Sequence, residues 1–277
     1  MEKRIWLITG ISSGLGKALA ERIMDSGDLV LGTFRKENQV NEFNKANQGR
    51  GHAYLLDVTD HLAIENVVVA IKNVYNKVDV LVNNAGIGFI GAIEESSMEE
   101  VRQVFEANFF GVLKLTQEIL PLMREHKAGH IVQISSHGGL KAFGGFGIYN
   151  ASKFALEGFS EALAQEVAPL GIKVSLVEPG PFRTQFAGSG LLEAKRTIPD
   201  YNETAGAFRA KLKGVDGKQE GDPAKAAEAI LQLVNDETPS FRLPLGKTAL
   251  LTIEMKLDSV RDDLERNRSI AENAVFI

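Results

Sequence analysis

The chain has 277 residues, of which 44% are hydrophobic and 24% are charged, a balance typical of a soluble globular protein. Its 27 glycines, 8 prolines and complete lack of cysteine exclude collagen-like and disulfide-rich classes, together with any site that needs a thiolate. The 31 basic residues are outnumbered by 36 acidic ones without long runs of like charge, so nucleic acid is not an expected partner.

The sequence carries no pattern typical of a membrane protein. Only residues 5–8 form an apolar run after Lys3 and Arg4, which is too short for a signal peptide. No stretch approaches the roughly 18 apolar residues that a spanning helix needs. We therefore expect no membrane partner and a cytoplasmic protein.

Short aliphatic and β-branched runs alternate with amphipathic helical patterns along the chain. The predicted strands are residues 5–9, 29–33, 53–56, 78–82, 131–135, 173–177 and 241–243. The predicted helices are residues 15–26, 60–75, 98–125, 149–168, 223–234 and 247–268, with a bend at Pro121. Because the strands are apolar on consecutive residues, both of their faces should be covered. The prediction is an α/β fold, a Rossmann-type doubly wound parallel β-sheet with helices on both faces.

We expect residues 1–277 to form one domain with two additions. Residues 180–221 are rich in Gly, Pro, Ser and Lys but include several large apolar side chains, and a structureless loop of this length is uncommon in a compact domain. This composition predicts short helices that fold over a site as a lid. Residues 247–268 form a charged helical extension, which is either solvated or closes an interface.

The first predicted strand leads through a glycine-rich turn, residues 9–16 with the sequence TGISSGLG, directly into a helix. Glycine permits positive φ and a close approach of backbone N–H groups to a pyrophosphate, and a helix N-terminus favours that anion. The turn predicts dinucleotide contacts from Gly10, Ser12, Ser13, Gly14, Leu15 and Gly16. A tight turn without a ligand is the alternative.

The second predicted strand ends in basic residues instead of the acid that usually contacts the ribose of NAD. Phe34 takes the position of that acid, and Arg35 and Lys36 follow it. Two cations suit a 2′-phosphate, which predicts NADP, with NADPH favoured and NAD kept open. The alternative is a solvated pair of surface charges.

Polar residues also follow the third and fourth predicted strands. Asp57 and Val58 close the third strand, and Asn84, Ala85 and Gly86 follow the fourth. Ligands of open parallel sheets bind at the carboxyl ends of the strands, so these residues are predicted to contact adenine and ribose. In the alternative interpretation, Asp57 caps the next helix and the asparagine satisfies backbone groups at a turn.

Tyr149 and Lys153 are four residues apart, so they share one face of a predicted helix. A neighbouring ammonium favours the phenolate, and Lys153 is therefore expected to lower the pKa of Tyr149. Ser136, at the end of the fifth strand, would hydrogen-bond the reacting oxygen. The adjacent His137 suggests a Ser-His hydrolase, but neighbouring strand residues point to opposite faces, so substrate contact or loop packing is the better interpretation. The five histidines lack metal-ligand spacing, and no metal is expected.

Together these motifs resemble the short-chain dehydrogenase/reductase family, in its single-domain branch with the TGxxxGxG and YxxxK motifs. The matching residues are 9–16, Asp57, 83–86, Asn108, Ser136, Tyr149, Lys153 and 179–184, in family order and spacing over nearly the whole chain. The resemblance implies that Tyr149 is the general acid of reduction, that Lys153 lowers its pKa and bonds the nicotinamide ribose, and that Ser136 positions the substrate oxygen.

The resemblance assigns further residues to the cofactor and the proton path. Asn108 is similar to the family asparagine that holds a water between the lysine and a proton relay; a satisfied helix asparagine is the alternative. Pro179, Gly180 and Thr184 resemble the turn that contacts the nicotinamide, with Thr184 bonding its carboxamide. Since the family commonly forms homodimers or homotetramers, through helices that begin here near Met98 and Tyr149, a homo-oligomer is also implied.

The expected function is an NADP-dependent oxidoreductase that transfers a hydride between the nicotinamide and a carbonyl or secondary alcohol. Reduction of a small hydrophobic ketone or aldehyde, with Tyr149 as proton donor, is the favoured direction. The candidate pocket walls are Phe89, Phe143, Phe146, Phe182 and Phe186, although aromatic side chains more often serve core packing. The alternative is a non-catalytic dinucleotide-binding regulator or scaffold on the same fold.

Overall fold

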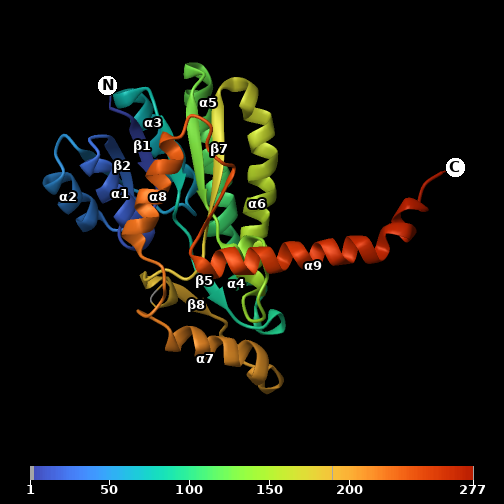
Figure 1. Ribbon diagram of the computed structural model, residues 1–277. Coiled ribbons are helices and arrows are strands. Elements are labelled where there is room, and N and C mark those ends of the chain that lie inside the picture. The colour runs from blue at the N-terminus through green and yellow to red at the C-terminus, as the bar shows by residue number, and fades with distance from the viewer. Residues whose placement is uncertain (1–2, 189, 277) are drawn as a thin grey trace.

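A seven-stranded parallel sheet forms the centre of the computed structural model, which describes residues 3–188 and 190–276 (Figure 1). The strands are β1 Ile5–Ile8, β2 Leu29–Phe34, β3 Gly51–Leu55, β4 Val80–Asn83, β6 Gly129–Ile134, β7 Ile172–Pro179 and β9 Arg242–Leu245. Their order is β3-β2-β1-β4-β6-β7-β9, so the chain winds outward from β1 in both directions. This order confirms the predicted doubly wound, Rossmann-type sheet.

Helices cover both faces of this sheet (Figure 1). One face packs against α1 Gly14–Asp25, α2 Glu37–Ala46 and α8 Pro223–Asn235, and the other against α3 His61–Tyr75, α5 Gly111–His126 and α6 Gly147–Val167. Successive strand residues enter opposite cores: Trp6 and Ile8 join the first cluster, whereas Leu7 joins the second. Because both faces are buried, the strands are apolar at consecutive positions.

The helix predicted over residues 98–125 is interrupted, which corrects the sequence-based assignment. It consists of α4 Met98–Phe105, a π-helical turn Glu106–Phe110, and α5. The interruption coincides with Asn108, whose fully buried side chain bonds both backbone groups of Ile87. Single π-turns often occur where a helix serves a functional site.

Some elements were missed by the sequence analysis because they bury little or are short. Helix α2 is mostly polar and has no fully buried residue, so few apolar positions indicate it. Strands β5 Gly88–Ile90 and β8 Leu191–Glu193 have only three residues each and pair as a separate two-stranded sheet. The segment 180–221 otherwise contains short helical turns and α7 Ala207–Gly214, in line with the expected short helices.

The last helix, α9 Lys247–Glu272, extends beyond the predicted end at residue 268 and projects away from the rest of the protein (Figure 1). Only Ala249 and Ile253 of this helix are buried. No helix in the described part of the chain is long and apolar enough to cross a membrane.

Arg242 on β9 ties α6 to the edge of the sheet. Its guanidinium pairs with Glu157 on α6, and it lies 2.8 Å from Glu178 on β7. Burial raises the pKa of Glu178 to about 7, with a smaller contribution from the Glu157 charge, despite the opposing effect of Arg242. The second carboxyl oxygen of Glu178 has no hydrogen-bond partner among the described residues, which is consistent with a neutral carboxyl.

This cluster predicts a measurable pH dependence of stability. Glu178 holds its proton up to about pH 7 in the folded chain but releases it near pH 4.5 when unfolded, so its stabilising contribution is complete below pH 4.5 and disappears as the pH rises to 7. Glu178→Gln removes this titration, and the wild type should lose on the order of 2 kcal/mol of unfolding free energy relative to the variant across that window. Urea unfolding at several pH values measures the difference. The exposed Glu161→Gln serves as the control, and an equal pH dependence of Glu178→Gln and wild type would contradict the assignment.

Candidate active site

The glycine-rich turn joins β1 to the N-terminus of α1. Gly10 and Gly14 adopt φ values of 71° and 60°, which side-chain-bearing residues rarely occupy. A Cβ atom at Gly16 would lie 2.3 Å from Asn84 Nδ2 and 2.5 Å from the Gly10 carbonyl oxygen. Glycine at position 16 is therefore required by the close approach of the turn to the end of β4.

Thr9 and Asn84 hold these two strand ends together. The Thr9 hydroxyl oxygen accepts hydrogen bonds from the backbone N–H groups of Asn84 at 3.0 Å and Ala85 at 2.9 Å. Asn84 Nδ2 donates to the carbonyls of Thr9 at 2.8 Å and Gly10 at 3.0 Å. Asn84 thus satisfies backbone groups, as the alternative interpretation proposed, and in doing so it fixes the shape of the glycine turn.

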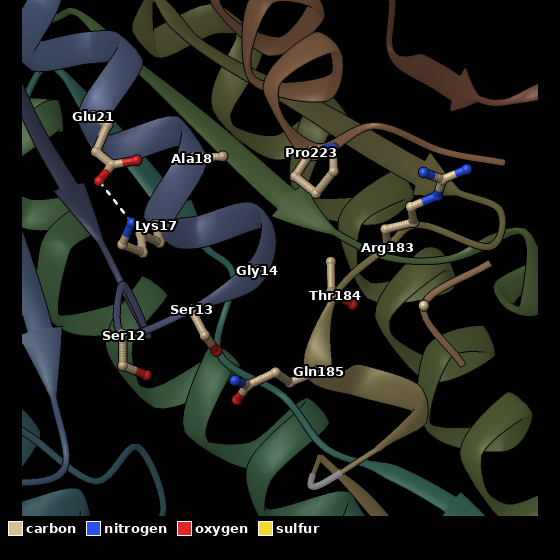
Figure 2. Close-up of a pocket in the computed structure, with 11 residues that line it drawn as sticks. Ser12, Ser13, Gly14, Lys17, Ala18, Glu21, Arg183, Thr184, Gln185 and Pro223 are labelled. Atoms are coloured by element: carbon tan, nitrogen blue, oxygen red, sulfur yellow. Dashed lines mark ion pairs between the residues drawn. The ribbon is translucent and has the colours of Figure 1, made fainter. Parts of the chain in front are cut away.

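A pocket of about 620 Å³ opens between the glycine turn and the segment after β7 (Figure 2). Its lining includes Ser12, Ser13 and Gly14 on one side and Arg183, Thr184 and Gln185 on the other. Thr184 lies so close to Gly14 that a Cβ there would be 3.3 Å from the threonine Cβ. The fold therefore brings the predicted pyrophosphate turn and the predicted nicotinamide turn to one pocket.

The N-terminus of α1 is suited to an anion. Ser13 occupies the N-cap position but its side chain makes no capping hydrogen bond, and the first turn carries no acidic residue. The first N–H groups of the helix and the positive end of its dipole are thus directed into the pocket without a competing carboxylate. These features fit the pyrophosphate of a dinucleotide.

The other predicted cofactor residues lie at the same carboxyl edge of the sheet, outside the lining of that pocket. Arg35 and Lys36 follow β2 and are exposed, and Lys36 is the N-cap residue of α2. Asp57 and Val58 follow β3. The proposal that Asp57 caps the next helix is wrong, because Asp60 caps α3 by accepting from the Ala63 N–H at 2.9 Å, whereas Asp57 accepts from Thr59.

Ser136, Tyr149 and Lys153 converge in the interior beside this pocket. Tyr149 and Lys153 lie one turn apart on α6, and both are buried, as is Ser136 after β6. The Tyr149 hydroxyl hydrogen-bonds with Ser136, whose oxygen also accepts from the Gly138 N–H at 3.0 Å. Lys153 Nζ donates to the Ile134 carbonyl at 2.8 Å. The structure thus brings together the three side chains that the sequence singled out.

The pKa values of Tyr149 and Lys153 are shifted mainly by burial and not, as the sequence analysis expected, by the attraction between the two groups. Burial raises the pKa of Tyr149 to about 12, with Ser136 acting in the opposite direction, and Lys153 makes no contribution to this shift. Burial also lowers the pKa of Lys153 to about 8, although the Glu157 carboxylate opposes that change. The expected lowering of the Tyr149 pKa by Lys153 is therefore not found, because loss of solvation dominates for both groups.

Asn108 is completely buried next to Lys153. Its side chain bonds both backbone groups of Ile87 and donates to the Ser152 hydroxyl at 3.1 Å. A Cβ atom added to Gly86 would lie 3.0 Å from Asn108 Oδ1 and 3.8 Å from Lys153 Nζ, so the three residues are adjacent. The Asn108 side chain is satisfied by protein groups, as the alternative interpretation stated.

Aromatic side chains pack around Tyr149. Its ring lies 5.1 Å from that of Phe146 and 5.5 Å from that of Phe186, between ring centroids. Phe143 and Phe208 belong to the same apolar cluster. Of the other candidate walls, Phe89 belongs to a separate buried cluster, and Phe182 packs against Gly221.

Several residues of the site were missed by sequence reasoning. Lys17, Arg183 and Gln185 line the pocket, and Phe208 of α7 contacts Phe146 with ring centroids 5.0 Å apart. Lys17 lies one turn beyond Ser13, so helical spacing could have indicated it, whereas only the tertiary fold places Phe208 here. His137 donates to or accepts from Thr252 of α9 at 2.9 Å and packs on Phe143, so loop packing is the correct interpretation of this residue.

Comparison with known proteins agrees with this geometry. Residues 4–192 match the family model described as short chain dehydrogenase. The chain belongs to the short-chain dehydrogenase/reductase family. It is 39% identical over 249 residues to the 3-ketodihydrosphingosine reductase of Bacteroides thetaiotaomicron, covering 89% of each chain. It is also 37% identical over 207 residues to an NADPH-dependent 3-dehydrocapnine reductase of Ornithobacterium rhinotracheale, covering 73% and 72% of the two chains.

A solved structure shares almost the entire fold. A short-chain dehydrogenase from Streptomyces avermitilis superimposes with a TM-score of 0.93 at 43% identity, covering 99% of this chain and 100% of that one. Family structures with a bound dinucleotide include one with NAD and one with NADP. This short-chain dehydrogenase/reductase is accordingly an NAD(P)-dependent oxidoreductase, which decides against the non-catalytic regulator.

Gly16→Ala should weaken dinucleotide binding and lower the unfolding free energy by about 1–3 kcal/mol, because its methyl group displaces Asn84 and the glycine turn. Isothermal titration with NADPH and urea unfolding measure the two effects. Gly158→Ala is a matched control, since it also lies in a helix but its Cβ meets no atom within 4 Å. That control should be stabilised by roughly 0.5–1 kcal/mol. Equal affinities of wild type and Gly16→Ala would contradict the role of the close approach.

Proposed function

We propose that this short-chain dehydrogenase/reductase reduces a hydrophobic ketone or aldehyde with NADPH and that Tyr149 donates the proton. The observation that carries the proposal is the buried arrangement of Ser136, Tyr149 and Lys153 close to the glycine-rich turn, whose features fit the pyrophosphate of a dinucleotide. When bound, the nicotinamide supplies the hydride. The protein orients the carbonyl and supplies the proton.

The protonation states favour reduction. A Tyr149 pKa of about 12 keeps the phenol protonated at neutral pH, so it enters the reaction as an acid. Ser136 holds the phenol by a hydrogen bond and is positioned to bond the same carbonyl oxygen. Lys153, with a pKa of about 8, is largely protonated at pH 7 and presents an ammonium near the site of proton transfer.

An apolar substrate is supported by the surroundings of Tyr149. Phe143, Phe146, Phe186 and Phe208 form an aromatic cluster with it, and such surfaces favour apolar ligands. The relatives described above are named for reduction of 3-ketodihydrosphingosine and 3-dehydrocapnine. We infer a carbonyl attached to a long or bulky apolar group.

We propose that residues 180–221 form the lid over this substrate. Two buried carboxylates anchor the segment to the rest of the protein. Glu95 accepts from the Ile198 N–H at 2.8 Å and pairs with Arg209 at 3.1 Å, while Glu100 accepts from the Lys195 N–H at 3.0 Å. The lid would therefore move as a braced unit, with Phe186 and Phe208 carried on it.

NADP preference rests on Arg35 and Lys36. Both are exposed at the end of β2, and they form no ion pair within the described chain, so their charges are available to a 2′-phosphate. The NADPH-dependent relative described above supports the same preference. Asp57 and Val58 would then flank the adenine.

Tyr149→Phe should reduce kcat for carbonyl reduction by at least about 100-fold, because the general acid is removed while the ring packing is kept. NADPH oxidation followed by absorbance, with a panel of long-chain and aromatic ketones and aldehydes, measures the effect. NADPH affinity should change little. Tyr75→Phe, in a distant helix, is the control, and full turnover by Tyr149→Phe would refute the proposed proton donor.

Arg35→Asp should lower the ratio of kcat/KM for NADPH to that for NADH by about tenfold or more, since a charge-assisted hydrogen bond is replaced by repulsion. Steady-state kinetics with both cofactors measure this ratio. Arg124→Asp makes the same charge change on the exposed surface of α5 and should leave the ratio unaltered. If Arg35→Asp also leaves it unaltered, Arg35 does not select the cofactor.

A further inference from the structure

Helix α9 leaves the protein with an uncovered apolar face. Its root is fixed near the active site, where Thr252 bonds His137 and the buried Ile253 packs on the protein. Every described residue from Leu257 onward is exposed. The helix projects far from the sheet and its covering helices (Figure 1).

One set of apolar residues of α9 follows a coiled-coil spacing, whereas the exposed Leu251, Met255 and Ile270 lie outside it. Leu250, Ile253, Leu257, Val260 and Leu264 alternate in steps of three and four residues, and Asn267 and Ala271 continue the series. The stripe begins at the buried Ile253, but Leu257, Val260 and Leu264 are 56%, 40% and 64% exposed. The face of α9 that packs on the protein at the start of the helix therefore continues for several turns with no other part of the described chain covering it.

The charges beside this stripe match a second copy of the same helix in antiparallel orientation. When Leu257 faces the partner's Val260, Glu254 lies opposite the partner's Arg261 on one flank, and Lys256 lies opposite the partner's Asp263 on the other. Twofold symmetry repeats each pair, which gives four attractive contacts, while the same register brings Lys247 opposite the partner's Arg268 and adds two repulsive ones. In a parallel pair, Lys256 would face the partner's Arg261 and repel it, and Asp263 would face the partner's Arg268 and attract it, so attraction and repulsion would balance.

Three of these four flanking charges, Glu254, Lys256 and Asp263, form no ion pair within the described chain. Arg261 contacts only Asp258 on its own helix, an exposed pair of little energetic value. The helix carries five basic and six acidic residues, so it lacks the excess of positive charge typical of helices that lie on anionic membranes. The charge pattern fits a copy of itself better than a lipid surface.

We propose that two copies of this protein associate through α9, as an antiparallel helix pair whose twofold axis passes level with Asp258 and Ser259. Leu257 and Val260 form its centre, and Leu264 faces the partner's Ile253, which its own chain already buries. Because Thr252 of α9 holds His137 beside Ser136, the paired helices are rooted in the wall of each active site. This proposal is independent of the substrate and of the cofactor.

The apolar centre is tested first, with the full chain in sedimentation velocity over a wide concentration range. Wild type should show an association step through α9 that Leu257→Asp combined with Val260→Asp removes, leaving unchanged any association through the helices that begin near Met98 and Tyr149. Met255→Asp, on the opposite face and 53% exposed, is the control and should leave the step intact. Circular dichroism and urea unfolding establish that each variant is folded.

A charge exchange tests the antiparallel orientation. One variant carries Glu254→Lys and Lys256→Glu, and a second carries Arg261→Glu and Asp263→Lys. Each alone places like charges opposite each other, so its dissociation constant should rise by about tenfold or more. An equimolar mixture restores all four attractive contacts and should regain the wild-type constant. In a parallel pair the same mixture would be repulsive between residues 256 and 261. The control Asp262→Lys with Arg266→Glu changes outward-facing charges only and should have no effect.

Three results would overturn the proposal. The first is a wild-type chain that shows no association, or association that is indifferent to the Leu257 and Val260 substitutions. The second is a mixture of the two charge variants that fails to regain affinity. The third is binding of the wild type to phosphatidylcholine and phosphatidylserine vesicles that is lost in the Leu257 and Val260 variant, which would make this face a lipid contact.

Discussion

The site depends on one constraint, the parallel pairing of strands that run outward from β1 in both directions. Parallel pairing brings the carboxyl ends of all the strands to one edge of the sheet. Because the chain winds in opposite directions on the two sides of β1, the segments that follow β1 and β4 diverge. Thr9 and Asn84 fix the distance between the ends of these two strands through hydrogen bonds to backbone groups. The glycine turn can therefore keep positive φ values and leave the N-terminus of α1 free for an anion.

The side chains proposed to be catalytic are positioned by burial, which disfavours their charged forms. Lys153 is enclosed between Asn108 and the end of β6, and its Nζ is held by a backbone carbonyl. The same burial raises the pKa of Tyr149 and lowers that of Lys153, so both shifts come from loss of water rather than from their mutual attraction. Arg242 bonds both Glu157 and Glu178 and so fastens α6 to the edge strands, and Glu157 adds a negative charge near Lys153. Position and protonation at this site are thus set by the same packing.

Helices α6 and α9 differ in how they are stabilised. Helix α6 buries one face against the rest of its own chain, although Phe154 on it stays exposed. Helix α9 buries only Ala249 and Ile253, yet its apolar stripe and flanking charges continue outward. A helix in water gains most of its stability from packing, and a second α9 provides a surface of matching period and opposite charge.

The sequence by itself determined the alternation of strands and helices, the glycine turn and the Tyr149–Lys153 pair, because these depend on local period and on spacing within one element. It did not reveal α2, which is mostly polar and has no fully buried residue, or the π-turn at Asn108, which depends on Ile87 from a distant segment. Only the tertiary structure brought Phe208 and Phe186 to Tyr149, showed that Asp60 rather than Asp57 caps α3, and reversed the expected shift in the Tyr149 pKa. Contacts between segments far apart in the chain, and the loss of water that accompanies them, arise only when the chain folds.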